Sequence, residues 1–223
     1  QIEHQCQLLI MALDLAFPTP IWTEKCTEDF SKLNYFTKFI TENNNMVALN
    51  KSGKTILSRC LDTWKLFEIK EILNKKFQKF CTDILKAPKE MEVAMTTSWL
   101  TSTKQGGSIG VHRHMNNWYA GLLYFDSDYA GASALQLHNP LMSCTSFAPD
   151  VQPLFNVNQG IQIPPTHNLL VFFPAYLYHA TSVQESTDTR HSLAFNFIPK
   201  RCGMTIDDFG TSDSQYDIEW LSS

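Results

Sequence analysis

The sequence predicts a mainly β domain of the α+β class, in which a β-sandwich or jelly roll follows a helical N-terminal part. Two patterns predict it: apolar residues recur at three- and four-residue spacing before about residue 90, and short strand-like runs separated by turns follow from Glu92 onward. The length of 223 residues, with 43% hydrophobic content, suits one buried core. We therefore expect a single domain over 1–223, with a helical part at about 15–90, a jelly-roll core at about 91–199 and a polar tail at 200–223.

The N-terminal part is predicted to begin with an extended segment and to continue with two amphipathic helices. Pro18 and Pro20 hold the backbone extended between Leu15 and Trp22, where we expect an edge segment. One helix is predicted over 27–40 and a longer one over about 63–85. The longer helix carries an apolar stripe of Leu66, Ile69, Leu73, Phe77, Phe80 and Ile84. Both helices are expected to pack along one sheet and to shield one of its edges.

Short strands are predicted after residue 91, each a run of aliphatic, β-branched or aromatic residues bounded by turn residues. They are Val93–Leu100, Ser108–Met115, Ala120–Phe125, Ala134–Leu137, Gly160–Ile163, Leu169–Phe173 and Ser192–Phe197. Such a succession is typical of a sandwich or jelly roll.

The charge balance argues against a nucleic-acid or membrane partner. A formal net charge of −4 and a pI near 6.0 provide no broad basic field. No apolar run approaches the roughly 20 residues that cross a bilayer. The six cysteines include no C-x-x-C pair, which favours reduced thiols over a disulfide framework. We therefore expect a soluble, cytoplasmic protein.

The N-terminal stretch is a poor signal peptide, because it has no basic leader and carries Glu3 and Asp14. Met11 could be the natural start, which would leave residues 1–10 outside the native chain. An ordinary N-terminal helix is the alternative.

A metal site is predicted from a pair of histidines and a later third one. His112 and His114 flank Arg113 in a predicted strand, so both imidazoles project from the same face and can meet one ion. His179 follows the apolar strand Leu169–Phe173, at the point where a jelly roll brings a late strand opposite an early one. The pair alone is weak evidence, and the third histidine strengthens it.

An anion site is predicted on the strand that follows. Period-two alternation places Arg190, Ser192, Ala194 and Asn196 on one face. A guanidinium beside a hydroxyl suits a carboxylate, because its donors can bind both oxygens.

In this order the motifs resemble the Fe(II)/2-oxoglutarate-dependent oxygenases, most closely a group of 2OG-Fe(II) oxygenases from bacteria and phages. The resemblance runs from about Phe17 to Phe197 and is most specific from Gly110 to Asn196. It rests on the H-x-H pair, a Leu-Leu-Tyr strand, a Phe-Pro followed by histidine five residues after the proline, and an Arg-x-Ser.

The resemblance implies a role for each matching residue and a double-stranded β-helix (jelly roll, cupin-like) fold. It makes His112 and His179 ligands of Fe(II), Arg190 and Ser192 the partners of the far carboxylate of 2-oxoglutarate, and Tyr124 a further contact to that carboxylate. It implies a 2-oxoglutarate-dependent dioxygenase, a hydroxylase that uses O2 and releases succinate and CO2. The hydroxylated C–H bond would belong to a protein side chain or a small molecule.

His114 departs from the family pattern, because most members have Asp or Glu at this position in a triad of two histidines and one carboxylate. A third neutral imidazole leaves iron more positive and makes zinc or nickel occupancy after purification more plausible. We expect His114 to be a ligand. The alternative is that a carboxylate such as Asp126, or a water, takes its place.

Further residues are candidates for contact with a small-molecule or peptide substrate. Asn116 and Trp118 lie in the loop after the metal strand, His138 lies at a strand end, and Asn196 shares the face of Arg190. A polar loop with Trp118 packed inward and a turn-stabilising role for His138 are the alternatives. The loops between Asn139 and Gly160 could form a pocket wall or a homodimer contact.

Two other functions remain open at the level of sequence. One is a non-catalytic jelly-roll binding module that retains a metal. The other is a cupin-like metalloenzyme with three histidines that does not use 2-oxoglutarate. The pairing of Arg190 with Ser192 on one strand argues against the second, because these residues would then lack a partner.

Overall fold

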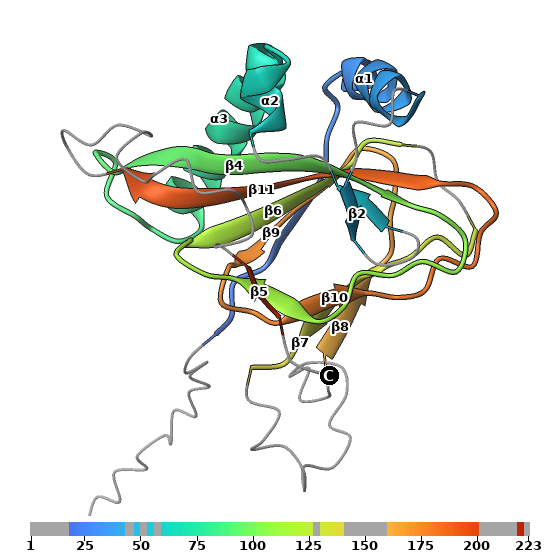
Figure 1. Cartoon of the computed structure of the whole chain (residues 1–223). Helices are drawn as coiled ribbons and strands as arrows, with labels where there is room; N and C mark the ends of the chain where they lie inside the picture. Colours follow the sequence, from blue (N-terminus) through green and yellow to red (C-terminus); the bar gives the residue numbers. More distant parts are fainter. Residues whose placement is uncertain are drawn as a thin grey trace, which may run out of the picture.

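Two antiparallel sheets face each other in a jelly roll, with the helices on the outer side of the larger sheet (Figure 1). The computed structural model describes residues 18–42, 47–49, 53–55, 59–126, 130–140, 160–200 and 218–220. None of the helices in these ranges is long and apolar enough to cross a bilayer.

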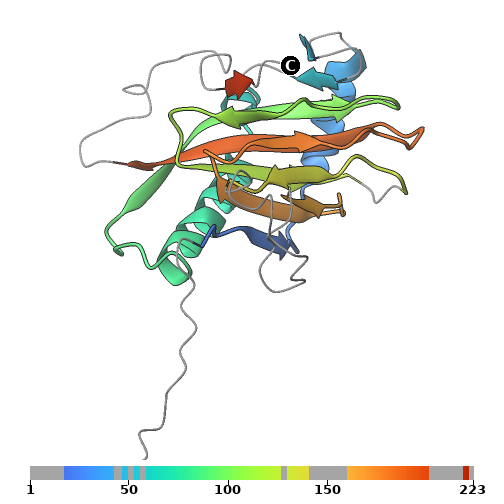
Figure 2. The same cartoon turned by 90° about the horizontal axis from the view of Figure 1, so that it is seen from below.

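In the described ranges the major sheet contains seven strands in the order β1-β9-β6-β11-β4-β3-β2, and Figure 2 shows them side by side. Their bounds are β1 Trp22–Lys25, β2 Val47–Leu49, β3 Gly53–Thr55, β4 Glu92–Thr103, β6 Tyr119–Tyr124, β9 Leu169–Pro174 and β11 Arg190–Lys200. The long strands β4 and β11 pair along their whole length, with one register shift between Asn196 and Phe197. Such a bulge bends a strand and redirects the side chains beside it.

The minor sheet has the strand order β12-β5-β10-β7-β8. Its members are β5 His112–His114, β7 Leu135–His138, β8 Gly160–Ile163, β10 His179–Thr181 and β12 Ile218–Trp220. β5 and β10 are direct neighbours, which brings two segments more than sixty residues apart together.

In the described part of the chain, three helices lie before β4: α1 Ser31–Glu42, α2 Cys60–Thr63 and α3 Phe67–Asp83. The aromatic ring of Phe77 on α3 stacks on Phe197 of β11 at a centroid distance of 4.1 Å and meets Phe172 of β9 edge-on. These contacts join α3 to the outer face of the major sheet.

The second predicted helix differs from the structure in two respects. A turn at Trp64–Leu66, in which Lys65 adopts a left-handed φ of 55°, separates α2 from α3. Five members of the predicted stripe are buried as expected, whereas Ile84 is 48% exposed, because α3 ends at Asp83. A regular 3.6-residue repeat cannot reveal where a helix stops.

Other predicted elements shift at their ends. α1 starts at Ser31 rather than residue 27, and the side chain of Asp29 accepts a hydrogen bond from the Ser31 backbone N–H. The first edge strand starts at Trp22, where the predicted extended segment ends, and it lies at one edge of the major sheet. The predicted segment before residue 18 lies outside the described residues. Of the tail predicted at 200–223, Lys200 belongs to β11 and 218–220 to β12, and the rest lies outside the described residues.

The core has two parts on opposite faces of the major sheet. On the outer face, α3 and neighbouring segments cover an aromatic cluster that includes Phe77, Phe172, Phe195 and Phe197. On the inner face, a smaller cluster between the sheets contains Ala120, Leu135, Leu137, Ile163, Val171, Phe173 and Leu177. The smaller inner cluster leaves room for polar side chains.

Candidate metal centre

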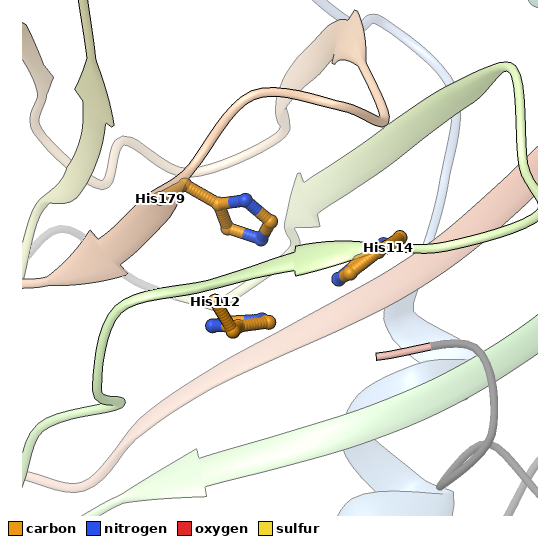
Figure 3. Close-up of side chains that lie close together, drawn as sticks. All are labelled: His112, His114 and His179. Carbon is orange, nitrogen blue, oxygen red and sulfur yellow. The ribbon is translucent and has the colours of Figure 1, made fainter. Parts of the chain in front are cut away.

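Three histidines from two adjacent strands of the minor sheet meet between the sheets. His112 and His114 project from one face of β5 because they lie two residues apart. β10 places His179 directly opposite His112. One ring nitrogen of each histidine lies within 4.8 Å of the others, and Figure 3 shows the three rings turned toward a common point. The three residues are 7%, 4% and 5% exposed, respectively, in the order of the chain.

Hydrogen bonds define which nitrogen of each ring faces this point. Nδ1 of His112 and Nδ1 of His179 each lie 2.9 Å from the backbone carbonyl oxygen two residues earlier. Nδ1 of His114 lies 2.5 Å from Oδ1 of Asn196. Carbonyl oxygens only accept, so each Nδ1 carries the proton and each Nε2 carries the lone pair that a metal requires. Nε2 of His114 is buried and has no hydrogen-bond partner in the described part of the chain.

Burial keeps the three imidazoles neutral. Desolvation is the main cause that lowers the pKa of each, and the neighbouring histidines add to it for His114 and His179. The pKa of His114 falls to about 3, and that of His179 falls well below its usual value. At neutral pH the cluster therefore offers neutral imidazoles, the form of histidine that binds metals.

A buried arginine lies in the same pocket. Arg190 is 2% exposed, and its Nη2 donates to Oγ1 of Thr103 at 2.8 Å. Its Nε and Nη1 are buried without a hydrogen-bond partner, and no acidic side chain of the described residues forms an ion pair with it. Burial lowers the pKa of this guanidinium from its usual value. A buried cation without a counter-ion costs stability, so this guanidinium is suited to bind an anion.

Tyr124 lies beside Arg190, although it is not among the residues that line the pocket. The guanidinium carbon of Arg190 lies 5.5 Å from the centre of the Tyr124 ring. The Tyr124 hydroxyl is buried without a hydrogen-bond partner among the described residues. Burial raises the pKa of this phenol, and the positive charge of Arg190 opposes part of the rise. The hydroxyl therefore stays protonated and can donate a hydrogen bond to an anion held by Arg190.

One pocket joins the histidines to the arginine. Its lining includes all three histidines, Arg190 and Ser192. Apolar side chains form much of the remaining wall: Trp99, Ile109, Leu122, Leu135, Phe173, Ala180 and Ala194. The parity of β11 explains the arrangement, because Arg190, Ser192 and Ala194 alternate onto the inner face as the sequence predicts.

These residues fit both a metal ion and a carboxylate-bearing co-substrate. Three Nε2 atoms can take three positions on one side of an ion and leave the others open. The unpartnered donors of Arg190 can bind a carboxylate in the same pocket, beside the Ser192 hydroxyl. The metal-ligating cluster found among the described residues contains no carboxylate, and Asp126 is not a member of it.

Asn196 has a different position from the one expected. Its amide is 1% exposed and is not part of the pocket lining. Oδ1 contacts His114, and Nδ2 donates to Oγ1 of Thr97 at 2.9 Å. Its contacts are therefore with a metal-site histidine and its own sheet. Thr97 is not among the residues predicted from the sequence, although period-two alternation places it on the same face of β4 as Trp99 and Thr101, which line the pocket.

The other candidates for substrate contact are not among the residues that line the pocket. Trp118 packs edge-on against Phe77 in the outer aromatic cluster, in agreement with the inward-packed alternative. Asn116 is an exposed residue with a left-handed φ of 59°, as expected in a tight turn. His138 ends β7, and its Nε2 is buried without a partner among the described residues. Their contact with a substrate stays a prediction.

Comparisons with known proteins found a matching family model and solved structures of similar fold. Residues 97–196 match the family model described as "Putative 2OG-Fe(II) oxygenase". The matched range contains the three histidines, Arg190, Ser192 and Tyr124. No curated protein sequence matches the chain.

Solved structures share the fold. HygX from Streptomyces hygroscopicus, crystallised with nickel, 2-oxoglutarate and hygromycin B, aligns with a TM-score of 0.57 at 9% identity, covering 82% of this chain and 84% of HygX. The epimerase SnoN, solved with Fe3+, alpha ketoglutarate and nogalamycin RO, aligns with a TM-score of 0.59 at 9% identity and covers 92% of both chains. A 2OG-Fe(II) oxygenase family oxidoreductase from Burkholderia pseudomallei gives 0.54 at 9%, with 80% and 83% covered. At this identity the likeness establishes a shared fold.

Proposed function

We infer that this chain is an Fe(II)- and 2-oxoglutarate-dependent oxygenase, with its chemistry in the region 97–196 that matches the family. One observation carries the inference: a buried arginine with two unpartnered donors opens onto the same pocket as three converging imidazoles. A structural metal site would not need the buried arginine, and a structural arginine would not need the three imidazoles. Together they suit a co-substrate that has a carboxylate at one end and metal-binding oxygens at the other.

The residues divide the work between holding the metal and holding the co-substrate. His112, His114 and His179 would hold Fe(II) through Nε2, with each Nδ1–H anchored to an oxygen. Arg190 would bind the far carboxylate of 2-oxoglutarate, assisted by Tyr124 and Ser192. Because Arg190 is held by Thr103 on the neighbouring strand, little side-chain freedom is lost when the anion binds.

The reaction type that we propose is hydroxylation of a C–H bond in a small molecule or a peptide side chain. Bound iron and 2-oxoglutarate supply the chemistry: one O2 and one 2-oxoglutarate are consumed, one oxygen atom enters the substrate, and succinate and CO2 are released. The apolar walls, Trp99, Leu122 and Phe173 among them, would exclude bulk water from the reacting atoms.

The first test is spectroscopic and needs no substrate. Anaerobic Fe(II) and 2-oxoglutarate should together give a weak visible charge-transfer band in the wild-type protein, and Arg190→Met should remove it at the same 2-oxoglutarate concentration. Arg113→Met is the matched control, because Arg113 lies over the Tyr178 ring on the opposite face of β5. It should keep the band. Absence of the band in the wild-type protein would refute the proposal.

A three-histidine metalloenzyme without 2-oxoglutarate is the second candidate, favoured by the lack of a carboxylate in the described metal cluster. It predicts metal binding that Arg190→Met leaves unchanged and that 2-oxoglutarate does not perturb. Uncoupled formation of succinate from 2-oxoglutarate in the presence of Fe(II) and O2 would exclude it. A non-catalytic module would bind the metal and form no succinate.

A further inference from the structure

The three histidines are not oriented in the same way. His112 and His179 donate from Nδ1 to the backbone carbonyl two residues earlier in their own chain segments, at 2.9 Å. No side-chain substitution removes these acceptors. His114 donates instead to the side chain of Asn196, which lies 82 residues away on β11. The orientation of His114 thus depends on the side chain of another residue.

We propose that Asn196 is the positioning residue for the third metal ligand, holding His114 as the Nδ1-protonated tautomer with Nε2 aimed at the ion. The proposal rests on the metal centre of the proposed function and adds to it a residue that does not line the pocket. An acceptor on the outer nitrogen fixes both the tautomer and the rotation of a ligating imidazole.

The surroundings of Asn196 suit this role. Its Nδ2 donates to Thr97, which is also its cross-strand partner on β4, and in this arrangement Oδ1 faces His114. Asn196 and Thr97 are 1% and 5% exposed. The only register shift between β4 and β11 follows immediately after Asn196. The centre of the Trp99 ring lies 5.4 Å from that of the His114 ring.

The choice of an amide has a chemical consequence. A carboxylate at this position would draw the Nδ1 proton more strongly and make Nε2 a more basic ligand, and it would bury a negative charge beside the site. The amide orients His114 while leaving it neutral. Asn196→Asp therefore keeps the acceptor and changes the electronic character of the ligand, whereas Asn196→Leu removes the acceptor at similar size.

The test uses Co(II) as an optical probe of the metal-free full chain under anaerobic conditions. Asn196→Leu should weaken Co(II) binding by about 10- to 100-fold and change its d–d bands. Asn196→Asp should keep the affinity within a few-fold of wild type and shift the bands. Thr97→Val should cause a smaller loss, because the amide remains but is less firmly held. Phe195→Leu serves as a control that alters the outer core and leaves Co(II) affinity unchanged.

A double-mutant cycle separates positioning from general damage. In a His114→Ala background, Asn196→Leu should have no further effect on Co(II) affinity, because the ligand that it positions is gone. An equal loss in both backgrounds, or wild-type affinity and bands in Asn196→Leu, would overturn the proposal. Adding 2-oxoglutarate to wild-type Co(II) protein tests the proposed function separately: unperturbed bands would count against that function while the cycle still reports on Asn196.

Discussion

The two faces of strand β11 differ in what they contribute. Its outer face presents Leu193, Phe195 and Phe197, all 0% exposed and packed in the aromatic cluster beneath α3. Its inner face presents Arg190, Ser192, Ala194 and Asn196, which are also almost fully buried but mostly polar. Side chains that are equally buried on the two faces therefore have opposite effects on stability. Apolar burial stabilises the fold, whereas burial of a cation without a counter-ion costs stability and prepares a binding site.

This contrast teaches that burial alone does not distinguish core from site. The distinguishing feature is whether buried polar atoms are satisfied. On the outer face the packing is close: a Cβ atom added to Gly121 would lie 2.0 Å from Cε2 of Phe195. On the inner face, Nε and Nη1 of Arg190 have no partner among the described residues. Substitutions on the two faces should consequently change different quantities.

The largest expected effect is on the outer face. Phe195→Ala should lower the free energy of unfolding by about 3–5 kcal/mol, because it opens a cavity above the Gly121 backbone. Urea denaturation of the metal-free protein measures it. At a temperature where the variant stays folded, its affinity for Co(II) should equal that of the wild type. A specific loss of metal binding with little loss of stability would contradict the separation of the two faces.

On the inner face, a substitution should weaken ligand binding without lowering the stability of the protein. Arg190→Met should weaken 2-oxoglutarate binding by about 2–5 kcal/mol, because the carboxylate loses its charged partner. The same change removes a buried cation with no ion-pair partner in the described residues, so the unliganded protein should be as stable as the wild type or more so. Thermal unfolding with and without 2-oxoglutarate measures both. A strongly destabilised unliganded variant would mean that Arg190 has a structural role.

The sequence predicts which residues of β11 face inward better than it predicts which partners those residues contact. Period-two alternation suffices to place Arg190, Ser192 and Ala194 together, and they do line one pocket. The same rule could not assign Asn196, because facing inward does not decide whether a side chain meets a substrate or another residue. That outcome depends on the pairing of β11 with β4, which brings Thr97 opposite it, and on the proximity of His114.

Helix and strand existence is likewise more predictable than helix and strand ends. The apolar stripe of α3 is visible in the sequence, yet the turn that separates it from α2 requires a left-handed Lys65 that no local pattern indicates. Strand β10 is only three residues long. The sequence predicts His179 as a metal ligand there but does not predict a strand. Its place beside β5 follows from the closure of the jelly roll, a long-range property.

The free energy of unfolding should fall in acid because of the inner face, which carries the buried histidine contact, rather than because of the apolar outer face. The pKa of His114 is about 3 in the folded protein against an ordinary value of 6.5, so the unfolded chain binds a proton first as the pH falls. Stability from neutral His114 is present above pH 6.5 and is lost progressively down to about pH 3. Between pH 7 and pH 5 this histidine alone should cost about 2 kcal/mol.

The measurement compares the metal-free wild type with His114→Gln by urea denaturation at pH 7 and pH 5. The variant should lose about 2 kcal/mol less than the wild type over this interval. Phe195→Leu, which changes only the outer face, should lose as much as the wild type. An equal loss in His114→Gln and the wild type would indicate that His114 is already accessible to protons in the folded state.

The smallest expected effect tests how far the inner face acts as a unit. Ser192 lies two residues from Arg190 on the same face and lines the same pocket, so its hydroxyl can add one neutral hydrogen bond to a carboxylate held by the guanidinium. Ser192→Ala should weaken 2-oxoglutarate binding by about 1 kcal/mol, roughly fivefold, and leave unfolding unchanged within error. In Arg190→Met the same substitution should have a smaller effect, because the carboxylate is no longer fixed beside it.

Titration of 2-oxoglutarate into the four proteins of this cycle, followed through the charge-transfer band or by calorimetry, measures whether the two effects on affinity are additive. Full additivity would mean that Ser192 and Arg190 contact different parts of the co-substrate.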